Sequence, residues 1–78
     1  MIKTYNGKEY NIIGLFIARN YHSGTMDFRP WAVFYAIAPG TGIPENCGSY
    51  AEAQKALAVA RKETGLPVVA NVSSYGGL

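Results

Sequence analysis

The fold is decided by one stretch, which begins Gly48-Ser49-Tyr50-Ala51-Glu52 and ends Glu63-Thr64-Gly65-Leu66-Pro67. Ser49 and Glu52 have the spacing of a capping box, in which each side chain accepts a hydrogen bond from the backbone amide of the other residue. Gly65 suits the left-handed residue that ends a helix, and Pro67 cannot continue one. The stretch therefore predicts one complete helix over residues 50–64, with strands and turns in the rest of the chain.

The residues at the N-terminus predict a β-hairpin. Asn6-Gly7 separates two strand-like runs, residues 2–5 and 8–12, and this dipeptide is the strongest short-range signal for a two-residue hairpin loop. Such a loop also sets the register. The expected cross-strand pairs are Tyr5 with Lys8, Lys3 with Tyr10, and Ile2 with Asn11.

The second strand is expected to run on through residue 18, because residues 12–18 are apolar on both faces. Such a strand is central in its sheet and needs a cover on each side. Gly14 within it predicts a bulge or the close approach of another backbone segment. The helix would supply one cover. The other is expected from a partner or from another copy of the chain, which leaves a homodimer open.

A third strand is predicted over residues 31–38. One of its faces carries mostly small side chains, so we expect the helix to lie close on that face; these residues are Ala32, Phe34, Ala36 and Ala38. Residues 39–48 read as a long irregular connection, residues 67–73 as a fourth strand parallel to an earlier one, and residues 74–78 as a flexible tail. The predicted fold class is two-layer α+β in the order β-β-β-α-β: a three-stranded antiparallel meander, one helix and a fourth strand.

The composition places the chain among single small globular domains. It has 78 residues, of which 15% are charged, against about 25% in typical proteins. The net charge of +2 is too small to indicate DNA binding and has the wrong sign for a nucleic-acid mimic. One cysteine excludes an intrachain disulfide. No apolar run matches a membrane span or a signal peptide, so the expected location is the cytoplasm.

The strongest candidate for a functional site is the segment from Tyr21 to Trp31. Aromatic residues, Met and Arg are enriched at protein interfaces and at their hot spots. We therefore expect this segment to bind a partner. The expected contact residues are Tyr21, His22, Met26, Phe28, Arg29 and Trp31. In the alternative interpretation, Phe28 and Trp31 turn inward and cap a small core.

A second hypothesis is a binding module for single-stranded nucleic acid. Such modules stack bases on exposed rings within a positive groove. Aromatic rings do lie along the predicted strands, at Tyr10, Phe16, Trp31 and Tyr35. Nearby positive charge would come from Lys3, Lys8 and Arg19. The strand motif of RNA-binding sheets is absent, however, and acidic residues at positions 9, 27 and 45 dilute the charge, so we rank this hypothesis second.

Catalytic and cofactor sites find little support in the sequence. Cys47 precedes the helix and His22 is the single histidine, but no third group is evident to orient such a pair. One Cys and one His do not make a closed metal site. The glycines of Gly40-Thr41-Gly42 are not followed by the lysine of a phosphate-binding loop. We therefore expect no enzymatic activity, no metal and no cofactor.

Taken together, these features resemble the very small proteins encoded by phages and mobile elements, including anti-CRISPR proteins. The resemblance rests on the Asn6-Gly7 hairpin, the strand over residues 31–38, the helix between Ser49 and Gly65, and the short chain. It implies a stand-alone α+β domain that occupies a surface of a nuclease or of a guide-RNA complex without catalysis. The expected function is a protein-binding inhibitor or regulator, with another protein or a protein–nucleic-acid complex as its partner.

Overall fold

The computed structural model describes residues 1–25 and 27–69, and within them five strands precede one helix. The strands are β1 (Ile2–Tyr5), β2 (Lys8–Asn11), β3 (Gly14–Arg19), β4 (Trp31–Ala38) and β5 (Thr41–Gly48), and the helix is α1 (Tyr50–Thr64). The α+β class is confirmed. The predicted order β-β-β-α-β is wrong, because the strands before the helix are five and not three.

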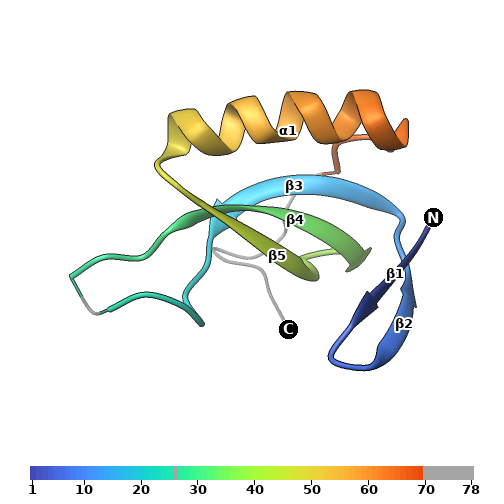
Figure 1. The fold of residues 1–78 in the computed structure, drawn as a ribbon, viewed down its shortest axis with the longest axis horizontal. Helices are drawn as coiled ribbons and strands as arrows, with labels where there is room; N and C mark the ends of the chain where they lie inside the picture. Colours follow the sequence, from blue (N-terminus) through green and yellow to red (C-terminus); the bar gives the residue numbers. More distant parts are fainter. Residues whose placement is uncertain (26, 70–78) are drawn as a thin grey trace.

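β1 and β2 form the predicted two-stranded hairpin, which projects from one end of the molecule (Figure 1). Asn6 and Gly7 both have positive φ angles, 50° and 78°, as a two-residue hairpin loop requires. The predicted register is confirmed, with Tyr5 opposite Lys8 and Ile2 opposite Asn11.

The predicted second strand is divided between two sheets at Ile12 and Ile13. The amide of Ile12 donates to the Met1 carbonyl at 2.7 Å, which extends the hairpin. The next amide, of Ile13, donates to the Ala36 carbonyl at 2.8 Å, in the other sheet. Successive amides of an extended chain point in opposite directions, so two adjacent residues serve two sheets. Residues 12–18 contain no polar residue, so the sequence did not indicate where the strand divides between the two sheets.

The larger sheet is three-stranded and antiparallel, in the order β3-β4-β5. The segment 39–48, predicted as an irregular connection, turns tightly and forms β5, so that prediction is wrong. Gly42 and Pro44 are uncommon within strands, so the sequence of this segment did not indicate a strand. In the described part of the chain β5 pairs only with β4, and an edge strand tolerates a proline whose missing N–H faces away from its partner. Gly42 is required because a Cβ there would lie 2.8 Å from the Tyr35 carbonyl oxygen.

The helix has the predicted ends. The Ser49 hydroxyl accepts from the Glu52 amide at 3.1 Å, and the Glu52 carboxylate accepts from the Ser49 amide at 3.3 Å, which completes the capping box. Gly65 is left-handed, with φ 71°, and its amide donates to the Arg61 carbonyl at 2.9 Å. Local signals alone therefore fixed both boundaries of α1.

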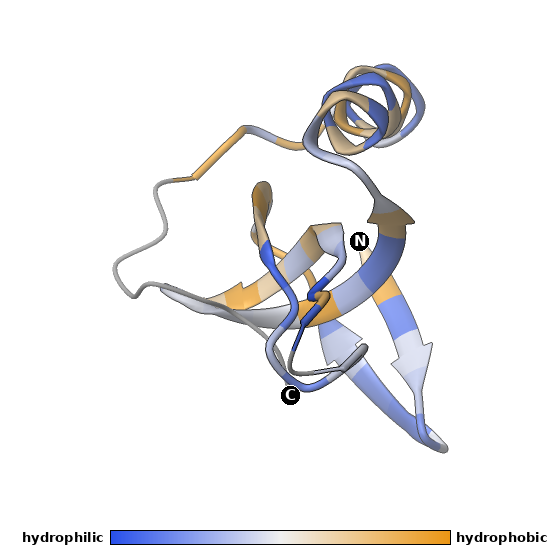
Figure 2. Ribbon diagram, turned by 90° about the vertical axis from the view of Figure 1, so that its left-hand side faces the viewer, coloured by the Kyte–Doolittle hydropathy of each residue, from blue (hydrophilic) through white to orange (hydrophobic). Residues whose placement is uncertain are grey.

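α1 lies as a layer over one face of the sheet (Figures 1 and 2). This face carries larger apolar side chains, namely Leu15, Val33, Tyr35 and Ile43. The prediction that the helix covers the face of Ala32 and Phe34 is wrong. The small residues that permit close packing are on the helix itself, where Ala53 and Ala60 are buried. Large side chains on the sheet then fill the space between the layers.

The second face of the sheet is also buried. Phe16 and Phe34, which are opposite each other in register, stack with ring centroids 4.9 Å apart and an interplanar angle of 6°. They are 2% and 0% exposed, and Val69 packs against their cluster. The expectation that a partner or a second copy must cover this face is not needed, since the single chain already buries it.

After the helix, the chain returns beside β3. Val68 forms a single parallel bridge with Leu15, and the Leu15 amide donates to the Pro67 carbonyl at 2.9 Å. A parallel return after the helix was predicted, and of the two alternatives predicted for Gly14, a bulge or a close approach, the structure shows the close approach. A Cβ at Gly14 would lie 2.6 Å from Val69 Cγ1 and 2.9 Å from the Pro67 carbonyl oxygen. The rest of the predicted fourth strand, residues 70–73, and the predicted tail lie outside the described residues.

Replacing Gly14 tests this contact. We expect Gly14→Ala to lower the free energy of unfolding by about 1–3 kcal/mol, because a backbone carbonyl must move to admit the methyl group. Urea denaturation followed by circular dichroism measures the change. Thr4→Ala, at an exposed position of the hairpin, is the control and should stay within about 0.5 kcal/mol of the parent. Equal stability of the two variants would contradict the close approach.

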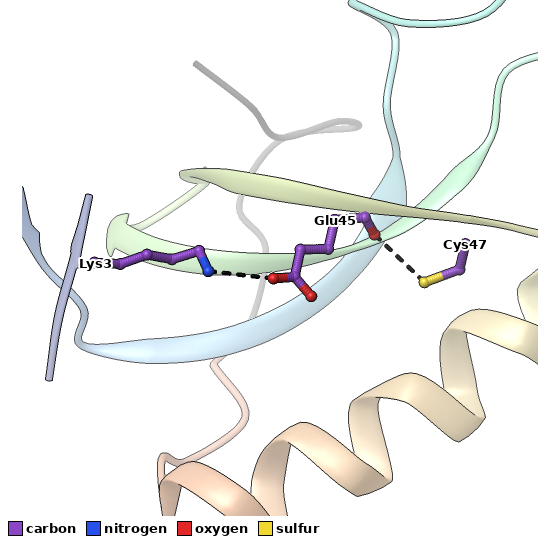
Figure 3. Close-up of polar contacts among 3 residues, drawn as sticks. All are labelled: Lys3, Glu45 and Cys47. Atoms are coloured by element: carbon purple, nitrogen blue, oxygen red, sulfur yellow. Dashed lines mark hydrogen bonds and ion pairs between the residues drawn. The ribbon is translucent and has the colours of Figure 1, made fainter. Parts of the chain in front are cut away.

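The hairpin is held against the sheet by Lys3. Its Nζ lies 3.2 Å from Glu45 Oε1 on β5 (Figure 3). The same atom lies 4.4 Å from the centre of the Tyr35 ring. Glu45 is half-exposed, so this ion pair contributes no more than about 1 kcal/mol. Tyr5 and Tyr10 also pack against the core on the helix side. Ring packing therefore adds to the ion pair in fixing the hairpin.

The titration of the Tyr35 phenol should report on the contact between the hairpin and the sheet. Burial first, and then the carboxylates of Glu45 and Glu63, raise its pKa above the usual 10.0. The folded state holds this proton more tightly than the unfolded state. The resulting stabilisation is therefore intact below about pH 10 and is lost as the pH rises through the folded-state pKa.

The titration is measured from tyrosinate absorbance, with Tyr35→Phe identifying the Tyr35 component. We expect Glu45→Gln to lower the pKa of Tyr35, since it removes one of the neighbouring negative charges that raise it. An unchanged Tyr35 titration in Glu45→Gln would show that the carboxylate does not act on the phenol.

Candidate functional site

The segment between β3 and β4, residues 20–30, extends from the end of the sheet opposite the hairpin (Figure 1). It contains most of the residues predicted to bind a partner. Met26 lies outside the described residues. The geometry of this loop decides whether its rings are presented to solvent or used in the core.

The base of the loop is fixed by amide side chains. Asn20 is 3% exposed, and its Nδ2 donates to Asn46 Oδ1 on β5 at 2.9 Å. Its Oδ1 accepts from the His22 amide at 3.2 Å. Asn46 Nδ2 then donates to the Ser23 hydroxyl at 3.1 Å. A buried amide with both ends bonded is a specific contact, because loss of one partner leaves a buried polar group unsatisfied.

The Arg29 side chain makes hydrogen bonds within the loop. Its Nη1 donates to the carbonyl oxygens of Tyr21 at 3.0 Å and Ser23 at 3.4 Å. The guanidinium carbon lies 6.0 Å from the centre of the Tyr21 ring. Arg29 was predicted as a contact to a partner. In the structure it also holds the two sides of the loop together.

A tight turn sets the position of Phe28. The Thr25 amide donates to the Phe28 carbonyl at 2.7 Å, and the Phe28 amide donates to the Thr25 hydroxyl at 3.1 Å. Gly24 precedes this turn with φ 84°, and a Cβ there would collide with the Phe28 carbonyl oxygen. The Phe28 side chain is 57% exposed, so it does not turn inward to cap the core.

Beside the loop, three side chains form a row over the end of the sheet. The Arg19 guanidinium carbon lies 5.0 Å from the Trp31 ring centre, and the Trp31 and Tyr50 rings meet edge to face at 4.8 Å. Arg19 Nη1 donates to the Arg29 carbonyl at 2.9 Å, which joins this row to the loop. Tyr50 is 49% exposed. We refer to the rings of Tyr21, Phe28, Trp31 and Tyr50 together as the aromatic surface.

The predicted contact residues differ in their exposure. Tyr21, His22 and Phe28 are exposed, whereas Arg29 and Trp31 are half-buried. Trp31 therefore combines a packing role with a partly accessible edge, as both interpretations of the sequence allowed. Sequence reasoning missed Tyr50, which was seen only as the first residue of a helix, and the pair Asn20 and Asn46, which lie too far apart in sequence to be linked by a motif.

The rings required for a nucleic-acid platform on the sheet are largely covered. Phe16 and Tyr35 are 2% and 8% exposed, and Tyr10 and Trp31 are half-buried. Base stacking on a sheet needs open ring faces. The support that this hypothesis drew from the spacing of aromatic residues is therefore removed.

The residues weighed for catalysis serve other contacts. Cys47 Sγ donates to the Glu45 carbonyl at 3.3 Å and packs with the core on the helix side (Figure 3). His22 is an exposed residue of the loop. Within residues 1–25 and 27–69, no three His, Cys, Asp or Glu side chains gather in a geometry that could hold a metal ion. No helix in this part of the chain has the length and apolar character needed to cross a membrane.

Comparison of the chain with protein-family models, curated proteins and solved structures finds no match. The inference of function therefore rests on the geometry of the loop and of the aromatic surface.

Removing the Asn20 amide tests the framework of the loop. We expect Asn20→Ala to lower the free energy of unfolding by about 1–3 kcal/mol, because both hydrogen bonds of the buried Asn20 amide are lost. Backbone amides of the loop, including that of His22, should also exchange faster with solvent. Hydrogen exchange followed by NMR measures this, and Asn11→Ala in exposed β2 is the control. Slow exchange in Asn20→Ala would show that the loop is ordered by other contacts.

Proposed function

We propose that the chain is a non-enzymatic interaction protein, an inhibitor or regulator that binds another protein, alone or within a protein–nucleic-acid complex, through the aromatic surface. One observation carries this proposal: Phe28 and Tyr21 are 57% and 45% exposed on a loop whose backbone is bonded in place. Aromatic residues are enriched at protein interfaces, and covering an exposed ring is favourable by about 1.5–3 kcal/mol.

The order of the loop supports the proposal. Binding is weakened when mobile segments must be ordered on contact. Here the Asn20–Asn46 bond and the two Arg29 bonds already fix the backbone. Rigid aromatic anchors in such a setting are typical of hot-spot residues, which each contribute about 2 kcal/mol or more to binding.

The more specific hypothesis, an anti-CRISPR inhibitor of phage origin, remains a prediction from the resemblance of the sequence. The fold adds only that the chain is a small α+β domain. Direct binding of single-stranded nucleic acid has less support, because the rings of Phe16 and Tyr35, on opposite faces of the sheet, are buried.

The test is capture of a partner by the immobilised protein from lysate of the source cells. We expect Phe28→Ala to weaken capture by about 30-fold, as loss of a hot spot of about 2 kcal/mol implies. Ile2→Ala is a matched control, because Ile2 is 58% exposed and lies on the hairpin at the opposite end of the sheet. Capture should be unchanged by this second substitution.

Circular dichroism spectra of both variants should match that of the parent, because neither side chain is in the core. Capture that is equally strong with Phe28→Ala and with the parent would contradict the proposal. Dependence on Ile2 instead would place the binding surface on the hairpin.

A further inference from the structure

The aromatic surface is accompanied by two arginines that form no ion pair with a carboxylate of the described residues. In the described part of the chain, the one ion pair is that of Lys3 and Glu45, at the far end of the sheet. The hydrogen bonds of Arg19 and Arg29 go to neutral carbonyl oxygens of residues 21, 23 and 29. Both side chains are half-buried, so their charges are partly withdrawn from water without a counter-charge.

These guanidinium groups keep unused donors in a fixed orientation. A guanidinium has five N–H donors in a planar fork that matches a carboxylate. In the described residues, Arg19 and Arg29 bond only through Nη1. Stacking of Arg19 over Trp31 and the backbone bonds of Arg29 hold both groups in place, so a bound anion would find its donors already positioned.

Other charges near the loop do not fill this role. The Glu52 carboxylate turns back to the amide and hydroxyl of Ser49. Asp27 is exposed in the loop, and it makes no ion pair with either arginine. Two positive charges therefore lie beside exposed rings without a counter-charge from the described residues.

We propose that the protein partner presents an acidic patch to this surface, with carboxylates engaging Arg19 and Arg29 and apolar side chains covering Phe28 and Tyr21. This rests on the proposed function and names the chemistry of its partner. Charge-assisted bonds to a carboxylate that is flanked by apolar contact are stronger than neutral ones and give direction to the encounter.

A nucleic-acid strand fits this surface less well. The Trp31 ring already has Arg19 over it and meets the Tyr50 ring edge to face, which leaves it little room to stack on a base.

The test uses the fluorescence of Trp31, which is the single tryptophan of the chain. The full-length protein is titrated at low ionic strength with a capped hexaglutamate peptide and, separately, with hexathymidylate. We expect hexaglutamate to change the emission of Trp31 saturably, because binding at Arg19 alters the group that covers the ring. We expect hexathymidylate to bind more weakly.

Arg19→Gln should weaken hexaglutamate binding by about tenfold or more, as loss of a charge-assisted bond implies. Lys8→Gln is the matched control, since it removes the same charge from the exposed tip of the hairpin, and it should leave binding unchanged. Arg19→Lys keeps the charge but loses the planar fork, so an intermediate affinity is expected. This variant also serves if Arg19→Gln does not fold by circular dichroism.

Tighter binding of hexathymidylate would overturn the proposal in favour of nucleic acid. No saturable change with either probe, or an equal loss in Lys8→Gln and Arg19→Gln, would also overturn it. These failures are separate from failure of the proposed function. A partner that is captured through Phe28 while hexaglutamate does not bind would keep the interaction surface and exclude its acidic partner.

Discussion

The structure depends on the packing of a slender helix against the larger side chains of one sheet face. Ala53 and Ala60 of α1 are buried against this sheet. Because alanine loses no side-chain entropy and adds no bulk, the helix axis can come close to the sheet. Leu15, Val33, Tyr35 and Ile43 beneath it are buried. A chain of 78 residues has a small core. A helix with bulkier side chains would lie farther from the sheet and leave the edges of this face exposed.

The position of β4 follows from this packing. Its residues Ala32 to Ala36 are all buried. Val33 and Tyr35 are in the cluster beneath α1, and Ala32, Phe34 and Ala36 are in the cluster on the other face, against which Val69 packs. A strand covered on both sides cannot also offer rings to a ligand. The exposed rings of the described residues, Tyr21, Phe28 and Tyr50, lie instead at the end of the sheet that carries the loop of residues 20–30.

The sequence predicted those elements whose signals are local. Ser49, Glu52 and Gly65 define the helix, and Asn6-Gly7 defines the hairpin and its register. Errors arose where the outcome depends on distant residues. β5 contains Pro44, which is acceptable only because of its place at the edge of a sheet, and the division at Ile12 depends on which carbonyl each amide meets.

The candidate site was also predicted only in part. Composition drew attention to the rings of residues 21–31, but their order depends on Asn20 and Asn46, which are 26 positions apart. No pattern of spacing marks such a pair. Tyr50 was missed for a similar reason, since only the packing of α1 brings it to Trp31.

Two sets of residues have different roles in the structure of the loop. Asn20, Ser23, Arg29 and Asn46 set the path of the backbone, while Tyr21 and Phe28 provide the exposed rings. Substitutions in the second set leave the hydrogen bonds of the first intact. The domain can therefore serve as a scaffold for retargeting, in which new specificities are selected by randomising the ring positions while the frame is kept constant.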